Sequence, residues 1–302
     1  TMTSRHFLDI AGLSADEVRL ILDLAQHPID SLGRPLEGVG AALIFEKPSN
    51  RTRHSMEIAV VQLGGHPVYT RGEEVGIDVR ETAEDIAAVM AGYHGLLAAR
   101  VFKHDVVVRM AKVSGVPVVN MLSDHSHPLQ ALADALTMQQ TIGDLTGRSV
   151  AWSGDWNNVA RSLAEVSVLL GARFSVATPP AYGPSASEVT RINALGPGEF
   201  VAGTDPVAAV AGADAVHTDV WVSMGQEAET AAKEKAFAAY KVTGALMAKA
   251  APSAQFFHCL PAHRGYEVDA EVIDGPASRV VPQAHNRLHS ARGALAFLLG
   301  VK

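Results

Sequence analysis

The chain has 302 residues, 48% hydrophobic and 19% charged, which is enough for two globular domains and too apolar for a disordered chain. Lys and Arg number 25 against 32 Asp and Glu, and a net charge of −7 argues against a nucleic-acid or anionic-membrane binder. The single cysteine, Cys259, cannot form an internal disulfide, which favours a reducing compartment. No membrane-span-length apolar run and no signal-peptide pattern is present in the sequence. We therefore expect a soluble cytoplasmic protein.

Short apolar runs alternate with segments of helical periodicity along most of the chain. In the first half they predict strands at residues 41–45, 67–69, 96–99 and 116–120, and helices before Gly64-Gly65, at 81–92 and at 128–140. In the second half they predict strands at 149–152, 174–177, 213–217 and 255–258, an amphipathic helix ending near Gly171, and loops at 179–184 and 196–203. This alternation predicts an α/β fold of doubly wound parallel sheets. The turn-rich residues 143–147 predict a domain boundary near the midpoint.

Residues 48–53, Pro-Ser-Asn-Arg-Thr-Arg, follow the first strong strand and open a helix. Backbone N–H groups at a helix N-terminus, two hydroxyls and two guanidinium groups favour an anion such as phosphate. The alternative is an ordinary Ser or Asn N-cap followed by surface arginines. Neither a G-x-x-x-x-G-K loop nor a G-x-G-x-x-G loop after a strand is present, which argues against common nucleotide-binding folds.

Three further groups of polar residues follow predicted strands, where ligands bind in open α/β sheets. His127 and Gln130 open a helix and could polarise a carbonyl, or His127 could simply cap a structural turn. Asp219 begins the segment Asp-Val-Trp-Val-Ser-Met-Gly, and Cys259 lies in His-Cys-Leu-Pro. A buried cysteine is often only a small apolar residue. A metal site from His258, Cys259 and His263 lacks the usual ligand spacing, so no metal is predicted.

Taken together, residues 49–53, 127–130, 219–225 and 258–261 resemble the transcarbamylases, nearly end to end and in the same order. The first two motifs imply carbamoyl phosphate binding, and the last two resemble the ornithine carbamoyltransferases. The resemblance implies a carbamoyl phosphate-binding domain at 1–143, with a C-terminal helix at about 289–302 packing back on it. It implies an ornithine-binding domain at 144–288, and homotrimers or assemblies of trimers.

The resemblance also implies roles for individual residues. Those for carbamoyl phosphate are Ser49, Asn50, Arg51, Thr52, Arg100, His127, Gln130, Cys259, Leu260 and Arg287. Those for ornithine are Asn158, Asp219, Ser223 and Met224. Among all of these, the catalytic group is Arg51, Arg100, His127, Asp219 and Cys259. The implied reaction transfers the carbamoyl group to the δ-amino group of L-ornithine and gives L-citrulline and phosphate in arginine biosynthesis. No cofactor is expected, because phosphate is already a good leaving group.

Departures from the family pattern leave alternatives open. Asn50 replaces a common Thr, Glu73 and Glu74 lie in a loop where relatives carry neutral or imidazole side chains, and His285 replaces a common Glu. Two carboxylates would repel a phosphate, so we expect the Glu73-Glu74 loop to point elsewhere. The alternative functions are a carbamoyltransferase for putrescine or an N-acylated ornithine, and a catalytically silent family member.

Overall fold

The computed structural model describes residues 5–222 and 230–302, which form two compact units. The first unit comprises residues 1–133 and 285–302, and the second comprises residues 134–284. Helix α6 (Pro128–Ile142) and helix α13 (Val280–Leu298) each run from one unit into the other. Among the described residues, no helix is long and apolar enough to cross a membrane. Each unit is built on its own parallel sheet, which confirms the α/β prediction.

The sheet of the first unit has the order β2-β1-β3-β4, with every pair parallel. Its strands are β1 (Gly40–Phe45), β2 (His66–Arg71), β3 (His94–Arg100) and β4 (Val118–Leu122). The connecting helices are α2 (Asn50–Gln62), α3 (Gly72–Val75), α4 (Ala83–Met90) and α5 (His104–Val113), and α1 (Ala15–Leu24) precedes the sheet. A 3₁₀ turn at Ile29–Leu32 follows α1.

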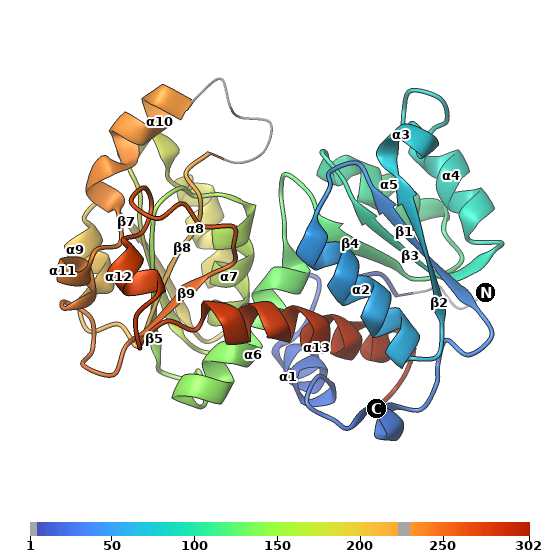
Figure 1. Ribbon diagram of the computed structural model, residues 1–302, viewed down its shortest axis with the longest axis horizontal. Helices are drawn as coiled ribbons and strands as arrows, with labels where there is room; N and C mark the ends of the chain where they lie inside the picture. The colour runs from blue at the N-terminus through green and yellow to red at the C-terminus, as the bar shows by residue number, and fades with distance from the viewer. Residues whose placement is uncertain (1–4, 223–229) are drawn as a thin grey trace. The chain divides into compact units, whose positions relative to one another are not determined.

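Helices cover both faces of this sheet (Figure 1). On one face, Ile86 of α4 and Val107 of α5 pack with Ile44 of β1 in a single buried cluster. On the other side α13 lies against α1 so closely that a Cβ on Gly293 would come within 2.5 Å of the Ile21 carbonyl oxygen. This close crossing of α1 and α13 therefore needs a residue without a side chain at position 293.

The N-terminal segment pairs with the edge of the first sheet at β4. The Phe7 N–H donates to the Val118 carbonyl at 2.8 Å, and the Asn120 N–H donates to the Phe7 carbonyl at 2.8 Å. The Asn120 side-chain amide also donates to the carbonyl of Leu8 at 2.9 Å. Phe7 itself is buried. The main-chain groups of β4 that face away from β3 are thus paired within the unit.

The sheet of the second unit has the order β7-β6-β5-β8-β9, again with every pair parallel. Its strands are β5 (Ser149–Ser153), β6 (Arg173–Ala177), β7 (Glu199–Gly203), β8 (Ala215–Thr218) and β9 (Gln255–His258). Its helices are α7 (Asn158–Leu169), α8 (Ala186–Asn193), α9 (Pro206–Val210), α10 (Thr230–Phe237), α11 (Gly244–Met247) and α12 (Ala270–Ile273). Short 3₁₀ turns occur at Pro180–Tyr182 and Ala238–Tyr240.

The loop predicted at residues 196–203 is wrong, because it contains the edge strand β7. Residues Glu199 to Gly203 pair in register with β6, so tertiary pairing overrides the weak strand preference of a glycine-rich stretch. The glycine at position 198 allows close backbone packing. A Cβ on Gly198 would lie 2.3 Å from the Ala172 carbonyl oxygen, so this chain segment packs directly against the end of α7 and the start of β6.

Candidate active site

The anion motif lies at the start of α2, directly after β1, as its sequence predicts. Ser49 is the N-cap, and its Oγ accepts from the Thr52 N–H at 3.4 Å and donates to Thr52 Oγ1 at 3.0 Å. The cap fixes the first turn of a 13-residue helix, whose N-terminal N–H groups and dipole favour negative charge. Ser49 therefore acts as the N-cap that the alternative interpretation predicts. This capping role is compatible with an anion site at the same helix N-terminus.

Two buried guanidinium groups converge on the hydroxyl of Thr52. Arg287 Nη2 donates to Thr52 Oγ1 at 2.9 Å, and its Nη1 donates to Gln130 Oε1 at 2.7 Å. Arg100 Nη1, at the end of β3, donates to the same Oγ1 at 3.4 Å. Arg100 and Arg287 are only 6% and 4% exposed. Burying two cations side by side is costly unless a negative charge accompanies them, so this cluster has the chemistry of an anion-binding site.

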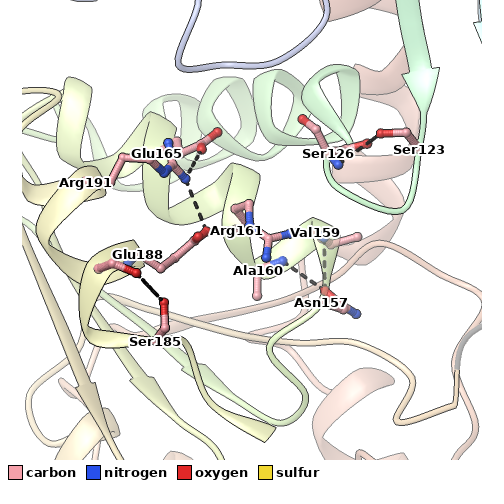
Figure 2. Close-up of polar contacts among 11 residues, drawn as sticks. Ser123, Ser126, Asn157, Val159, Ala160, Arg161, Glu165, Ser185, Glu188 and Arg191 are labelled. Carbon is pink, nitrogen blue, oxygen red and sulfur yellow. Dashed lines mark hydrogen bonds and ion pairs between the residues drawn. The ribbon is translucent and has the colours of Figure 1, made fainter. Parts of the chain in front are cut away.

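His127 lies at the start of α6 in this cationic surrounding. Burial lowers the pKa of His127 well below its usual value, and the positive charges of Arg287, Arg100 and Arg51 lower it further. The imidazole is therefore neutral at physiological pH and offers one N–H donor without a charge of its own. The turn that precedes it is closed by Ser123, whose Oγ donates to the Ser126 carbonyl (Figure 2). A neutral donor of this kind suits a carbonyl oxygen better than a phosphate.

The two arginines of the motif behave differently. Arg53 is exposed, pairs with Glu57 at 2.8 Å and stacks on the ring of Tyr69 at 3.8 Å. Arg51 is half-buried, and its charge is felt by His127. Glu74 of the acidic loop pairs with Arg71 at 3.2 Å. Of these charged groups, only Arg51 belongs to the electrostatic surroundings of the buried cluster.

A second group of polar side chains gathers in the second unit, beyond the ends of β8 and β9. Cys259 Sγ donates to Asp219 Oδ1 at 3.2 Å, and Asn157 Nδ2 donates to Asp219 Oδ2 at 2.8 Å. Asp219 is 7% exposed and Cys259 is half-buried. Both oxygens of the carboxylate are thus held in fixed directions. A buried carboxylate beside a thiol provides acceptors for an amine or ammonium group.

The backbone that carries Asn157 and Asn158 is held by the start of α7. Asn157 Oδ1 accepts from the N–H groups of Val159 and Ala160, each at 3.0 Å (Figure 2). The same helix is joined to α8 by charged side chains, where Arg191 contacts buried Glu165 at 2.7 Å and Glu188 at 3.2 Å. Asn157 therefore has two tasks, capping the helix and orienting Asp219.

Ligand atoms of Asp219, His258 and Cys259 lie within 4.8 Å of one another, close enough for a metal ion. The two ring nitrogens of His258 are both engaged, Nδ1 by the Leu260 N–H at 2.9 Å and Nε2 by Glu267 at 3.0 Å. A metal would have to displace one of these buried bonds. His263, the third member of the set weighed from the sequence, pairs instead with Glu267 at 3.7 Å.

The predicted site residues thus fall into two groups. The first unit holds Ser49, Asn50, Arg51, Thr52, Arg100, His127, Gln130 and Arg287. The second unit holds Asn158, Asp219, Cys259 and Leu260. Ser223 and Met224 lie outside the described residues. Sequence reasoning missed Asn157, although its position in the Asp-Trp-Asn-Asn loop after β5 is the kind of strand-end position where ligand-site residues occur.

Comparisons with known proteins match both units. The family model for the carbamoyl-P binding domain of aspartate/ornithine carbamoyltransferases matches residues 5–140, and that for the Asp/Orn binding domain matches residues 146–298. An ornithine carbamoyltransferase of Thermus thermophilus is 46% identical over 297 residues, which cover 98% of this chain and 97% of that one. The structure of the ornithine carbamoyltransferase of Pyrococcus furiosus superposes with a TM-score of 0.93 at 42% identity, covering 100% and 99% of the two chains.

The matches over both units identify the class of protein as a carbamoyltransferase, with one domain for carbamoyl phosphate and one for the amino acid that accepts the carbamoyl group. The chain belongs to the aspartate/ornithine carbamoyltransferase family. An acetylornithine transcarbamylase, 29% identical with a TM-score of 0.87, shares the fold. The fold alone therefore does not select the acceptor, and the residues of the second unit must do so.

Proposed function

We propose that this chain transfers the carbamoyl group of carbamoyl phosphate to the δ-amino group of L-ornithine, giving L-citrulline and phosphate. The observation that carries the proposal is the buried cluster of Arg100, Arg287, Thr52 and Gln130 at the N-terminus of α2. It combines fixed donors for a phosphate with polar groups for an amide, which are the two ends of carbamoyl phosphate. The relatives named ornithine carbamoyltransferase at 42–46% identity support the same donor and acceptor.

In the proposed reaction, the neutral δ-amino nitrogen attacks the carbonyl carbon of carbamoyl phosphate. A C–N bond forms and negative charge develops on the carbonyl oxygen. The bond from carbon to the phosphate oxygen then breaks, its electron pair leaves with the phosphate, and the departing phosphate takes up the proton that the nitrogen loses. Arg51, Arg100 and neutral His127 are the donors for the developing charge. Preorganised donors of this kind contribute about a hundredfold or more each to the rate. Burial and the neighbouring guanidinium groups lower the pKa of His127, so the role that we assign to it is a hydrogen bond to the carbonyl oxygen.

The acceptor side of the proposal rests on Asp219, Cys259 and the adjoining asparagines. A carboxylate that is 7% exposed and fixed by Asn157 is suited to bind the α-ammonium group of an amino acid. Asn158 is the candidate for the α-carboxylate, together with Ser223 and Met224 from outside the described residues. Cys259 orients the incoming amine beside the carboxylate. A role for the thiol as proton acceptor is compatible with this arrangement.

The same proposal includes a homotrimer, or an assembly of trimers, in the cytoplasm, acting in arginine biosynthesis without a cofactor. The family resemblance supports the trimer, and the single half-buried cysteine suits a reducing compartment. The Pyrococcus furiosus relative that is 42% identical is named an anabolic ornithine carbamoyltransferase.

The test is a coupled assay of phosphate and citrulline release from carbamoyl phosphate. With L-ornithine, both products are expected in equal amounts and in proportion to enzyme. Carbamoyl phosphate also decomposes in water, so a reaction without acceptor provides the background. Phosphate release that ornithine does not raise above this background would overturn the proposal.

A further inference from the structure

His258 is the last residue of β9 and directly precedes Cys259, and its backbone N–H is held by a side chain of α13. The His258 N–H donates to Gln283 Oε1 at 2.9 Å, and Gln283 Nε2 donates to Asp134 Oδ1 at 2.7 Å. His258 is 1% exposed. The end of the strand is therefore anchored before the chain turns into the Cys259 segment.

The hydrogen bonds of the His258 ring fix which nitrogen carries the proton. The Leu260 N–H donates to His258 Nδ1 at 2.9 Å, so Nδ1 presents a lone pair. The proton of the neutral ring is then on Nε2, which donates to Glu267 Oε1 at 3.0 Å. The same oxygen accepts from the His263 N–H at 2.8 Å. Burial raises the pKa of Glu267, but these bonds outweigh it and leave the pKa below its usual value.

Leu260 adopts a backbone conformation that leucine disfavours. Its φ is +60°, in the left-handed region where non-glycine residues are uncommon and need support from their surroundings. The bond from the Leu260 N–H to His258 Nδ1 joins the residues on either side of Cys259. This bond closes a small turn whose central residue is the one that presents its thiol to Asp219.

We propose that His258 is a positioning residue for Cys259, acting through Nδ1 on the Leu260 N–H, and that Glu267 sets its tautomer. The side chain next to the thiol is then neither its base nor a ligand for substrate. Its contribution is to hold the turn so that Cys259 Sγ stays within reach of Asp219. The proposal deepens the proposed function, on which its kinetic readout rests, and names residues to which that function assigns no role.

The two hydrogen bonds of His258 can be separated by substitution. In His258→Asn, the side-chain oxygen occupies about the position of Nδ1 and still accepts from the Leu260 N–H, but the contact with Glu267 is lost. In His258→Gln, the amide nitrogen occupies about the position of Nε2 and still donates to Glu267, but the acceptor for Leu260 is lost. Both variants remove a buried imidazole, so a merely structural role predicts similar losses for both.

Two readouts compare the variants. Cys259 is the only cysteine, so the rate of alkylation by iodoacetamide measures the accessibility and reactivity of this thiol alone. This measurement does not depend on the enzymatic reaction. We expect His258→Gln to be alkylated at least tenfold faster than the parent and to lose at least tenfold in kcat/KM for ornithine, mainly through KM. His258→Asn should stay within about threefold of the parent in both. Lys241→Met, which removes the contact of Lys241 with Asp269 in the same region, is the control and should match the parent.

Equal behaviour of the Asn and Gln variants in either readout would overturn the proposal. A measurement on the unaltered protein tests it independently of any variant. In the nitrogen spectrum of protein labelled in histidine, the His258 signals should show the tautomer with the proton on Nε2. A proton on Nδ1 would refute the assignment even if both variants failed to fold. Absence of citrulline formation in the parent would instead contradict the proposed function, and would leave the alkylation and tautomer results valid.

Discussion

The two units place their polar groups at the same position in the fold but with opposite charge. In the first unit, strand ends and a helix N-terminus bring together Arg100, Arg287 and neutral His127. In the second, strand ends bring together a carboxylate, a thiol and an amide around Asp219. Under the proposed function, one parallel-sheet architecture would bind the anionic carbamoyl phosphate in one unit and the α-ammonium group of ornithine in the other. The difference lies in a few side chains and not in the topology.

The largest expected effect concerns the acceptor that the second unit selects. Ornithine carries an α-carboxylate that putrescine lacks, although both have a second ammonium group, so polar partners built for the carboxylate remain unpaired with putrescine. We expect kcat/KM for ornithine to exceed that for putrescine by at least roughly a thousandfold. Steady-state assays with both amines, and with an N-acylated ornithine, measure this ratio. Comparable rates would leave only a broader carbamoyltransferase function.

The first unit should respond to the loss of one arginine and tolerate the loss of another. We expect Arg51→Ala to lower turnover by about a hundredfold or more, because it removes a donor for the developing charge. Arg53→Ala is the matched control, since Arg53 pairs with Glu57 and stacks on Tyr69. Its turnover should stay within about twofold of the parent. Equal losses in the two variants, at unchanged melting temperatures, would refute this division of roles.

The charge of Asp219 is the corresponding test in the second unit. Replacing a charged partner by a neutral one at a buried hydrogen bond typically costs about 1.5–3 kcal/mol. We therefore expect Asp219→Asn to lower kcat/KM for ornithine by about 10- to 100-fold, and kcat/KM for 5-aminopentanoate, which lacks the α-ammonium group, by much less. The control is Asp214→Asn, at the opposite end of β8, where the carboxylate accepts from the Ser149 N–H at 2.9 Å. A loss shared equally by ornithine and 5-aminopentanoate would contradict the role in the α-ammonium site.

Buried imidazoles occur in both units, and His217 of the second unit offers a test of stability. His217 stacks on Phe257 with ring centroids 4.5 Å apart, and burial lowers the pKa of His217 to about 3. In the unfolded chain the ordinary value is about 6.5, so the unfolded state binds a proton below that pH and the folded state does not. Stability is therefore complete above pH 6.5 and falls as the pH drops towards 3.

Because of His217, the free energy of unfolding should be about 2 kcal/mol lower at pH 5 than at pH 8. We expect His217→Phe to reduce the difference between these two pH values by about that amount, measured by urea unfolding. His54→Gln is the control, because His54 is exposed on α2. An unchanged pH dependence in His217→Phe would show that His217 takes up protons in the folded protein.

Much of the fold follows from the sequence because many of its strands are apolar on both faces. The prediction of β9 at residues 255–258 agrees with the structure although β9 stands at one end of the sheet order, since Phe256 and Phe257 are fully buried. The strand β7, at the other end of that order, is not predicted, because its own composition is weakly strand-forming and its pairing with β6 is not visible in the sequence. Helices α1 and α5 were also not predicted, although Ser14 and Glu17 form a capping box at the start of α1.

The sequence predicts that the site residues follow the ends of strands, but it predicts few of the contacts that these residues make. Arg51 and Arg53 are equivalent in a motif, but residues two positions apart in a helix point about 200° apart, so only one can face the cluster. The helical periodicity of the sequence is therefore enough to separate the two arginines. The contact of Asn157 with Asp219, and the bonds of His258 with Leu260 and Glu267, depend on loop conformations that no periodicity reports.

The pairing of Phe7 with β4 has a practical consequence for handling the protein. Residues 118–122, Val-Val-Asn-Met-Leu, form a strand of high β-propensity whose outer edge is closed only by the backbone of the N-terminal segment. A truncation that removes Phe7 would turn this edge into a template for pairing between molecules, with aggregation as the outcome. Affinity tags and fusion partners at this end therefore need a spacer that leaves residues 6–8 free to pair.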